Sequence, residues 1–218
     1  MPKPAPLVSE PMPGGAPPAA SITTIGDVVD EVSAIQPGPD QEWVLRTGAA
    51  TSIPVRALEG YATAAFLISN AQPDCHLGWN TLAAIGAVET GHAGGALTDE
   101  GIAEPAIIGV PLDGSNGPQE PDTDRGGYDS DTAWDRVVGP LQFTPAAWSS
   151  FGVDADGDGA ANPQDIDDAA LTAAFRLCQY GDLATTEGWD SALHAYNPSN
   201  DYIEAVRGRA AEYAASAD

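Results

Sequence analysis

Aromatic residues are confined to one part of this chain, which limits where a core can form. No Phe, Trp or Tyr precedes Trp43, whereas nine of the 19 prolines lie in residues 1–40. A Pro-, Ala- and Gly-rich segment without aromatic side chains buries too little apolar surface to offset the entropy of ordering it. We therefore expect residues 1–42 to form a mostly disordered lead-in, with one or two helical turns at most in 27–35. Residues 43–218 are expected to form one folded domain.

The fold class predicted for that domain is mainly α. Apolar residues recur at helical spacing in 55–66, 79–89, 189–196 and 202–213. Helix-start signals occur at Thr144-Pro145, Asp165 and Ser199, and Gly181 is expected to end the helix that begins at Ile166. Between 91 and 131 the chain has no periodicity and is rich in Gly, Pro and Asp. We expect a long irregular excursion there, which in a compact domain is usually functional.

Charge excludes two classes of partner. The chain has 8 Lys and Arg against 32 Asp and Glu, a formal net charge of −24. A nucleic-acid binder needs clustered cations to neutralise phosphates, and docking on an anionic membrane needs a basic patch. No apolar run is long enough for a transmembrane helix, and the first residues lack the apolar core of a signal peptide.

An acidic loop at 154–165 fits the twelve-residue calcium loop of EF-hands. Oxygen ligands are expected at positions 1, 3, 5, 7 and 12, with a glycine (Gly159) at position 6; these ligands are Asp154, Asp156, Asp158, the carbonyl of Ala160, and Asp165. Position 12 is usually Glu, so the shorter Asp165 is a departure. We predict one structural Ca²⁺ and no organic cofactor. The alternative is a solvated acidic turn, and a calcium sensor is disfavoured because only one such loop occurs.

Glu89 continues an apolar helix face. It follows Leu82 by seven residues and Ile85 by four, so the three share a side of the helix. Partial burial disfavours the charged carboxylate and would keep a proton available for general acid catalysis. The alternative is a glutamate at the helix end whose carboxylate extends into water.

Four stretches in this order carry a resemblance to a known family: LAAIGAVETGHAGG (82–95), PDTDRGGYDSDTAWDRVVGPLQFTPAAW (121–148), DADGDGAANPQDIDDAALTAAFRLC (154–178) and ALHAYNPSNDYIEAV (192–206). Together they resemble the B-type lytic murein transglycosylases, in particular the secreted actinobacterial forms, over about residues 50–215. The resemblance implies a lysozyme-like fold and non-hydrolytic cleavage of the MurNAc–GlcNAc bond of peptidoglycan, leaving a 1,6-anhydro-MurNAc end. It also implies an extracytoplasmic location, secreted or associated with the cell wall, and peptidoglycan glycan strands as the partner of a monomeric enzyme.

The same resemblance assigns roles to single residues. Glu89 matches the family's one catalytic acid, and Thr90 stands where serine is usual. Gln142 matches a glutamine that lines the sugar groove, and Tyr196-Asn197 matches a Tyr-Asn pair near the acid. The aspartates of the 154–165 loop match the family's ion loop. The stretch His92-Ala93 departs from the family pattern.

Aromatic side chains near Gln142 offer faces for stacking on sugar rings. Phe143, Trp134 and Trp148 are close to it in sequence, and Tyr128 follows two glycines in the irregular segment. We expect Tyr128 and Phe143 to contribute to substrate binding. Trp148, on a short capped helix, is expected in the core.

The two cysteines, Cys75 and Cys178, are far apart in the sequence. Two cysteines of an exported protein usually pair, whereas in the cytosol they would be two separate buried thiols. Since the family acts outside the membrane, we expect a Cys75–Cys178 disulfide.

Two other functions stay open at this point. A lysozyme-type hydrolase on the same fold would use water and would need a base such as Asp129 or Asp131. A catalytically silent cell-wall-binding module is the second alternative, favoured by Thr90 and the altered stretch after it.

Overall fold

The computed structural model describes residues 19, 38–115 and 117–216. The expected turns at 27–35 and nearly all of the expected lead-in lie outside these residues. Within them the chain is mainly helical, as predicted, with seven α-helices, three 3₁₀ turns and one two-stranded sheet. The elements are α1 (Gln41–Thr51), α2 (Val55–Ala71), η1 (Pro73–Cys75), α3 (Trp79–Thr90), η2 (His92–Gly95), β1 (Ile108–Pro111), β2 (Arg136–Val138), α4 (Pro145–Phe151), α5 (Ile166–Leu177), η3 (Cys178–Tyr180), α6 (Thr186–Tyr196) and α7 (Asn200–Ser216).

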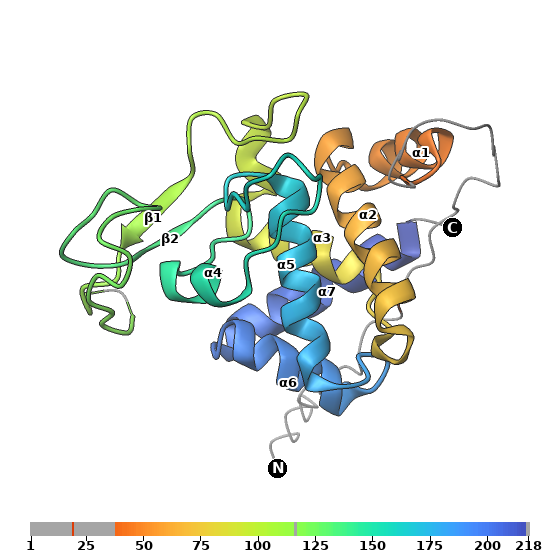
Figure 1. Cartoon of the computed structure of the whole chain (residues 1–218). Coiled ribbons are helices and arrows are strands. Elements are labelled where there is room, and N and C mark those ends of the chain that lie inside the picture. Colours follow the sequence, from red (N-terminus) through yellow and green to blue (C-terminus); the bar gives the residue numbers. More distant parts are fainter. Residues whose placement is uncertain (1–18, 20–37, 116, 217–218) are drawn as a thin grey trace, which may run out of the picture.

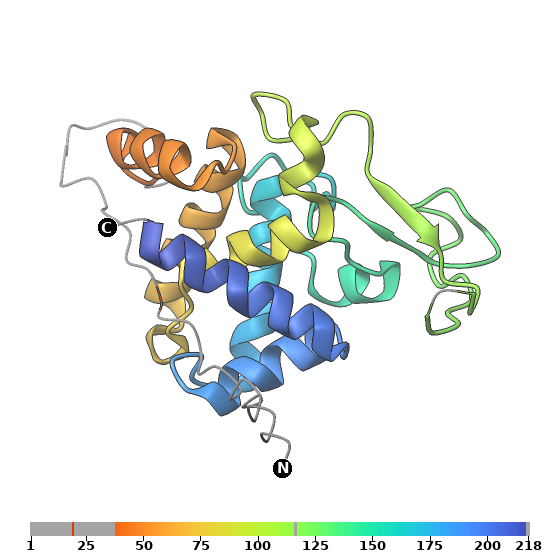
Figure 2. The ribbon, with the colours of Figure 1, turned by 180° about the vertical axis from the view of Figure 1, so that it is seen from behind.

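The helices form a body around α3, and the two strands project from it (Figure 1). α2 packs along α5, and α3 packs against both α2 and α7. In the view of Figure 2, α7 lies in front of α3. The residues of α3 from Trp79 to Gly86 are all buried. This central position explains the apolar face that ends at Glu89.

One glycine sets the distance between α2 and α3. A Cβ at Gly86 would collide with the hydroxyl of Tyr61 on α2. Because glycine has no Cβ, Tyr61 can lie across α3, and its hydroxyl is 3.2 Å from Nδ1 of the buried His92. The other ring nitrogen of His92 is 2.9 Å from the Tyr213 hydroxyl. A small residue one turn before Glu89 thus fixes the end of α3 between α2 and α7.

The predicted helix-start residues act as caps. Thr144 accepts a hydrogen bond from the Ala147 amide, Asp165 from the Asp167 amide and the Ser199 hydroxyl from the Tyr202 amide. The helix that begins at Ile166 ends as an α-helix at Leu177 and continues as η3 to Tyr180, where Gly181 with φ 96° ends it. These expectations from sequence are confirmed.

Two parts of the fold differ from the expectation. α1 was not predicted, and it begins at Gln41, before the expected boundary at 43, because Asp40 caps it through the Trp43 amide. The irregular excursion contains β1, which pairs antiparallel with β2, Ile108 facing Val138 and Pro111 facing Arg136. We call β1, β2 and the described residues between them the arm.

Aspartate side chains hold the arm together. Asp122 accepts hydrogen bonds from three consecutive amides, at 124–126, and Asp129 accepts from the amides of Asp131 and Arg136. Asp131 pairs with the Arg136 guanidinium at 2.9 Å. Such side chain–backbone bonds order a chain without helical or strand periodicity.

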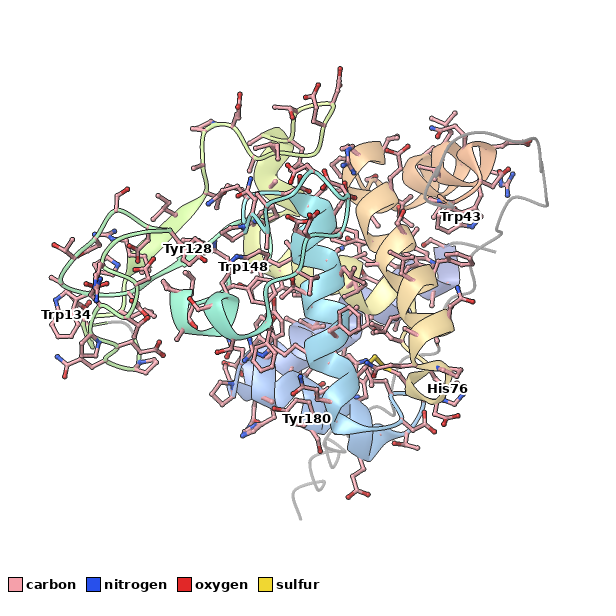
Figure 3. The ribbon with its side chains drawn as sticks, in the orientation of Figure 1. Trp43, His76, Tyr128, Trp134, Trp148 and Tyr180 are labelled. Atoms are coloured by element: carbon pink, nitrogen blue, oxygen red, sulfur yellow. A yellow bond between two sulfur atoms is a disulfide. The ribbon has the colours of Figure 1, made fainter. Side chains whose placement is uncertain are left out.

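The predicted disulfide is present. Cys75 in η1 and Cys178 in η3 are bonded, with a sequence separation of 103 residues. The bond joins the segment before α3 to the end of α5, and Figure 3 shows it beside His76. In the described part of the chain, no helix is long and apolar enough to cross a membrane.

Candidate active site

Glu89 lies at the wall of a cleft of about 690 Å³ between the helical body and the arm. The cleft is lined by the end of α3, the arm, the segment after β2, the last turn of α5 and the end of α6; its residues are Glu89, Leu112, Gly117, Pro118, Glu120, Val137, Gln142, Thr144, Arg176, Tyr196, Asn197, Pro198 and Ser199. Thus Glu89, Gln142, Tyr196 and Asn197, predicted separately from sequence, line one cavity.

The Glu89 carboxyl is half-buried in the last turn of α3. Burial raises its pKa to about 7, while the nearby Tyr202 hydroxyl lowers it in part. The helix C-terminus, with its partial negative charge, also disfavours a carboxylate there. Near neutral pH the group is therefore divided between its acid and its base form.

Tyr202, in the first turn of α7, is a site residue that sequence reasoning missed. Its side chain is 8% exposed, and its hydroxyl makes no hydrogen bond of standard geometry within the described residues. It nevertheless lies near enough to the Glu89 carboxyl to lower the pKa of that group. Its place in the periodic 202–213 stripe indicated only a core residue.

Tyr196 and Asn197 join the site at the end of α6. The Tyr196 hydroxyl donates to the Leu141 carbonyl at 2.7 Å, so in this structure it does not bond to Glu89. The Asn197 Oδ1 accepts the Ser199 amide at 3.0 Å. Within the described residues, the N–H groups of the Asn197 side-chain amide donate no hydrogen bond. They can therefore donate to a ligand in the cleft.

Gln142 stands in a left-handed turn, with φ 50°, after β2. Its side-chain amide donates to the Gly139 carbonyl at 2.9 Å. Gly139 has φ 77°, and a Cβ there would collide with the Pro163 carbonyl. The turn is therefore pressed against the loop before α5, which directs Gln142 to the cleft.

Three predicted substrate residues lie elsewhere or are engaged. Phe143 is 1% exposed and packs edge-on against Trp148 and Tyr196, so it belongs to the core and not to a stacking surface. The Thr90 hydroxyl donates to the Pro140 carbonyl at 2.7 Å and accepts the Ala93 amide, so it holds the segment beside Gln142. Tyr128 is exposed on the arm, which also carries Trp134 (Figure 3), and it is outside the cleft lining.

The carboxylates considered as a second catalytic group do not line the cleft. Asp129 is 3% exposed and both its oxygens accept backbone amides, and Asp131 is paired with Arg136. Glu120 on the arm, by contrast, does line the cleft with Glu89. Sequence alone gave no reason to select it among the many acids.

The acidic loop before α5 brings three carboxylates together, but not the predicted set. Carboxylate oxygens of Asp154, Asp156 and Asp168 lie within 4.8 Å of one another. Asp165 caps α5 through the Asp167 amide instead, and Asp158 accepts the Ala160 amide. Asp168, 1% exposed, accepts the amides of Ala155 and Asn162. Burial and the charges of neighbouring carboxylates raise the pKa of Asp168 to about 6. A bound cation would relieve the repulsion between these carboxylates.

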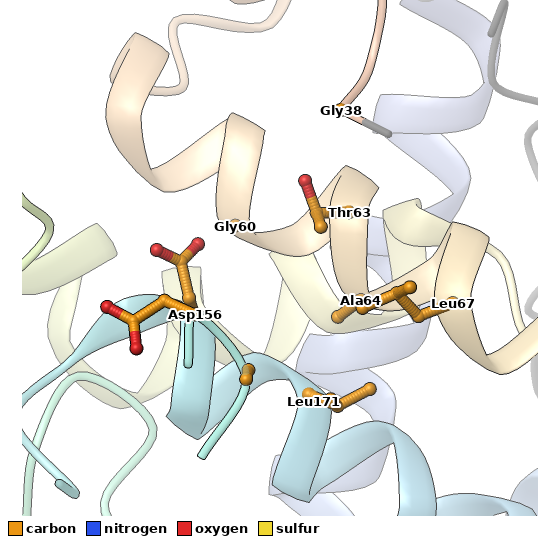
Figure 4. A pocket seen from close by; sticks show the side chains of 9 residues that line it. Gly38, Gly60, Thr63, Ala64, Leu67, Asp156 and Leu171 are labelled. Atoms are coloured by element: carbon orange, nitrogen blue, oxygen red, sulfur yellow. The ribbon is translucent and has the colours of Figure 1, made fainter. Parts of the chain in front are cut away.

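A second cavity, of about 200 Å³, lies between α2 and α5 (Figure 4). Asp156 borders it from the acidic loop, and the rest of its wall is mainly apolar, with Leu67 and Leu171. It shares no lining residue with the Glu89 cleft.

Comparison with models of protein families, with curated proteins and with solved structures gave no match.

Proposed function

We propose that the chain is a lytic transglycosylase that cleaves the MurNAc–GlcNAc β-1,4 bond of peptidoglycan. The observation that carries this proposal is Glu89, a carboxyl whose burial raises its pKa to about 7, in a cleft that Gln142, Tyr196 and Asn197 also line. The mainly helical fold and the resemblance of four sequence stretches to the B-type enzymes support the proposal.

The chemistry needs one group that acts first as acid and then as base. Protonated Glu89 gives its proton to the glycosidic oxygen, and the bond from that oxygen to C1 of MurNAc breaks. The N-acetyl group of MurNAc stabilises the cation that develops at C1. The 6-hydroxyl of the same sugar then attacks C1, and the Glu89 carboxylate takes the hydroxyl proton. The proton that Glu89 takes from the 6-hydroxyl replaces the one it gave to the glycosidic oxygen, so the carboxyl is restored and no water is consumed.

The neighbours of Glu89 have supporting roles in this proposal. Gln142 and Asn197 offer amide groups for N-acetyl and hydroxyl groups of the glycan. Tyr196, held by the Leu141 carbonyl, offers a ring at the cleft wall. Thr90 holds the 139–140 segment to the end of α3.

A water-using hydrolase is a second candidate, favoured by Glu120. Glycosidases that use water normally employ two carboxyl groups, one on each side of the bond. Glu120 lies on the arm and Glu89 on the body, and both line the cleft. In that case Glu120, and neither Asp129 nor Asp131, would be the base.

Two further features belong to the proposal. The carboxylates of Asp154, Asp156 and Asp168 would hold one Ca²⁺, since calcium prefers several hard oxygen ligands. An extracytoplasmic site of action agrees with the Cys75–Cys178 disulfide, because such bonds persist in oxidising compartments.

The test is digestion of purified peptidoglycan with mass analysis of the products. We expect ends lighter by one water than hydrolysed ends, and loss of about 10²–10⁴ in rate for Glu89→Gln, the usual contribution of general acid catalysis. Glu120→Gln is the matched control and should keep both rate and product. If Glu120→Gln abolished turnover and the products carried added water, the hydrolase would be the correct function.

A further inference from the structure

Arg176 is unusual among the cations of this acidic protein. Five of the seven arginines in the described residues form ion pairs with carboxylates; they are Arg46, Arg56, Arg136, Arg207 and Arg209. Arg176 and Arg125 form none there. Arg125 is exposed on the arm, whereas Arg176 is half-buried and lines the Glu89 cleft.

The guanidinium of Arg176 is held in place by α6. It extends from the last turn of α5, and its Nη2 donates to the Ala195 carbonyl at 2.8 Å. Its Cζ lies 5.1 Å from the centroid of the Tyr196 ring. A hydrogen bond and a cation–π contact therefore orient the group without neutralising its charge.

Most of the hydrogen-bonding capacity of Arg176 remains open. A guanidinium carries five N–H donors in a planar fork, and the Ala195 carbonyl is the one acceptor that the described residues provide. An oriented, half-buried guanidinium with free donors fits a carboxylate, which it can bind through two parallel hydrogen bonds.

From this arrangement we infer that Arg176 forms a carboxylate-binding subsite of the cleft, for an acidic substituent on the glycan. The inference rests on the proposed function and specifies the substrate further. The carboxylate has two sources in peptidoglycan: the lactyl group of MurNAc when no peptide is attached, or the peptide stem. In a protein of net charge −24, one local cation would let an anionic strand bind where the remaining surface repels it.

The test measures binding by calorimetry in the Glu89→Gln background, so that no glycan is cut. The probes are a peptide-free GlcNAc–MurNAc hexasaccharide with free lactyl carboxylates, the same hexasaccharide with these groups amidated, and a glycan with intact stem peptides. We expect a carboxylate-bearing glycan to bind about 10- to 100-fold more tightly than the amidated one, as for a charged hydrogen-bonded pair. A preference for the free hexasaccharide identifies the lactyl group, and a preference for the stem-bearing glycan alone identifies the peptide.

Arg176→Gln should remove this preference and leave affinity for the amidated glycan unchanged. Arg125→Gln is the matched control: it removes the same charge outside the cleft and should keep the preference. Arg176→Lys keeps the charge without the fork and should retain part of it. Melting curves of each variant establish that it is folded.

Four results would contradict the subsite. Equal binding of charged and amidated glycans would overturn the subsite and leave the proposed function intact. A preference for the charged glycan that survives Arg176→Gln would do the same. Equal weakening for both glycans in Arg176→Gln would reduce Arg176 to a support for Tyr196. If the folded Glu89→Gln protein bound no glycan at all, the proposed function would fail, and the subsite with it.

Discussion

At the scale of single residues, the protonation of Glu89 determines the expected pH dependence. Burial raises its pKa to about 7, and the first step needs the protonated form. We therefore expect kcat/KM to fall as pH rises through about 7, since the acid is lost there. A pH–rate profile on soluble glycan measures this, and a rate that stays constant from pH 6 to 9 would contradict the acid role.

Tyr202 makes a prediction of its own. Its hydroxyl lowers the pKa of Glu89 by favouring the charged carboxylate. Tyr202→Phe should therefore move the alkaline limb of the profile to higher pH, with the fold kept because the ring remains. Tyr213→Phe, also on α7 but in contact with His92, should leave the limb in place. An unshifted limb in Tyr202→Phe would show that the hydroxyl does not act on Glu89.

Residues differ in how far the sequence reveals them. Glu89 could be predicted because helical periodicity places it on a buried face. Arg176, Tyr202 and Glu120 could not, since their roles depend on α5, α7 and the arm meeting around the cleft. Phe143 was misplaced because closeness to Gln142 in sequence does not determine which way a ring faces.

At the scale of elements, the helices with apolar periodicity and capping residues were predictable, and the arm was not. Its order comes from Asp side chains that bind nearby amides, which leaves no periodic pattern. α1 was missed for a related reason, because its short amphipathic pattern lies beside the Pro-rich stretch. The helix is stabilised by the Asp40 cap and by Trp43, whose ring packs edge-on against that of Trp79 with the ring centroids 5.5 Å apart.

The acidic loop before α5 provides the element-scale prediction. We expect Ca²⁺ to raise the melting temperature by binding the folded state, and a chelator to lower it. Asp168→Asn should abolish this calcium effect, because Asp168 shares the cluster with Asp154 and Asp156.

Asp165→Asn is the control, since asparagine also caps a helix and should leave most of the calcium effect. The opposite order, with Asp165→Asn abolishing the effect and Asp168→Asn preserving it, would restore the twelve-residue ligand set. A melting temperature that ignores both calcium and chelator would show that the loop is an acidic turn only.

At the scale of the whole molecule, a disulfide links η1 to η3, two segments that lie far apart in the sequence. The Cys75–Cys178 disulfide closes a separation of 103 residues that includes α3, the arm and α5. Removing a native bond of this kind typically costs about 2–5 kcal/mol. We expect a loss in this range for the Cys75→Ser, Cys178→Ser double variant in denaturant unfolding. Two free thiols in the oxidised wild-type protein would contradict the pairing.

If the 6-hydroxyl of MurNAc attacks C1, as we propose, no oxygen atom from water enters the new MurNAc ends, and isotope labelling measures this. Wild-type protein digests peptidoglycan in water enriched in ¹⁸O, and the mass of each new MurNAc end is compared with a digest in ordinary water. We predict anhydro ends whose mass is the same in both, and no such products from Glu89→Gln. New ends that carry one ¹⁸O atom would show that water attacks C1, and would contradict the transglycosylase in favour of a hydrolase.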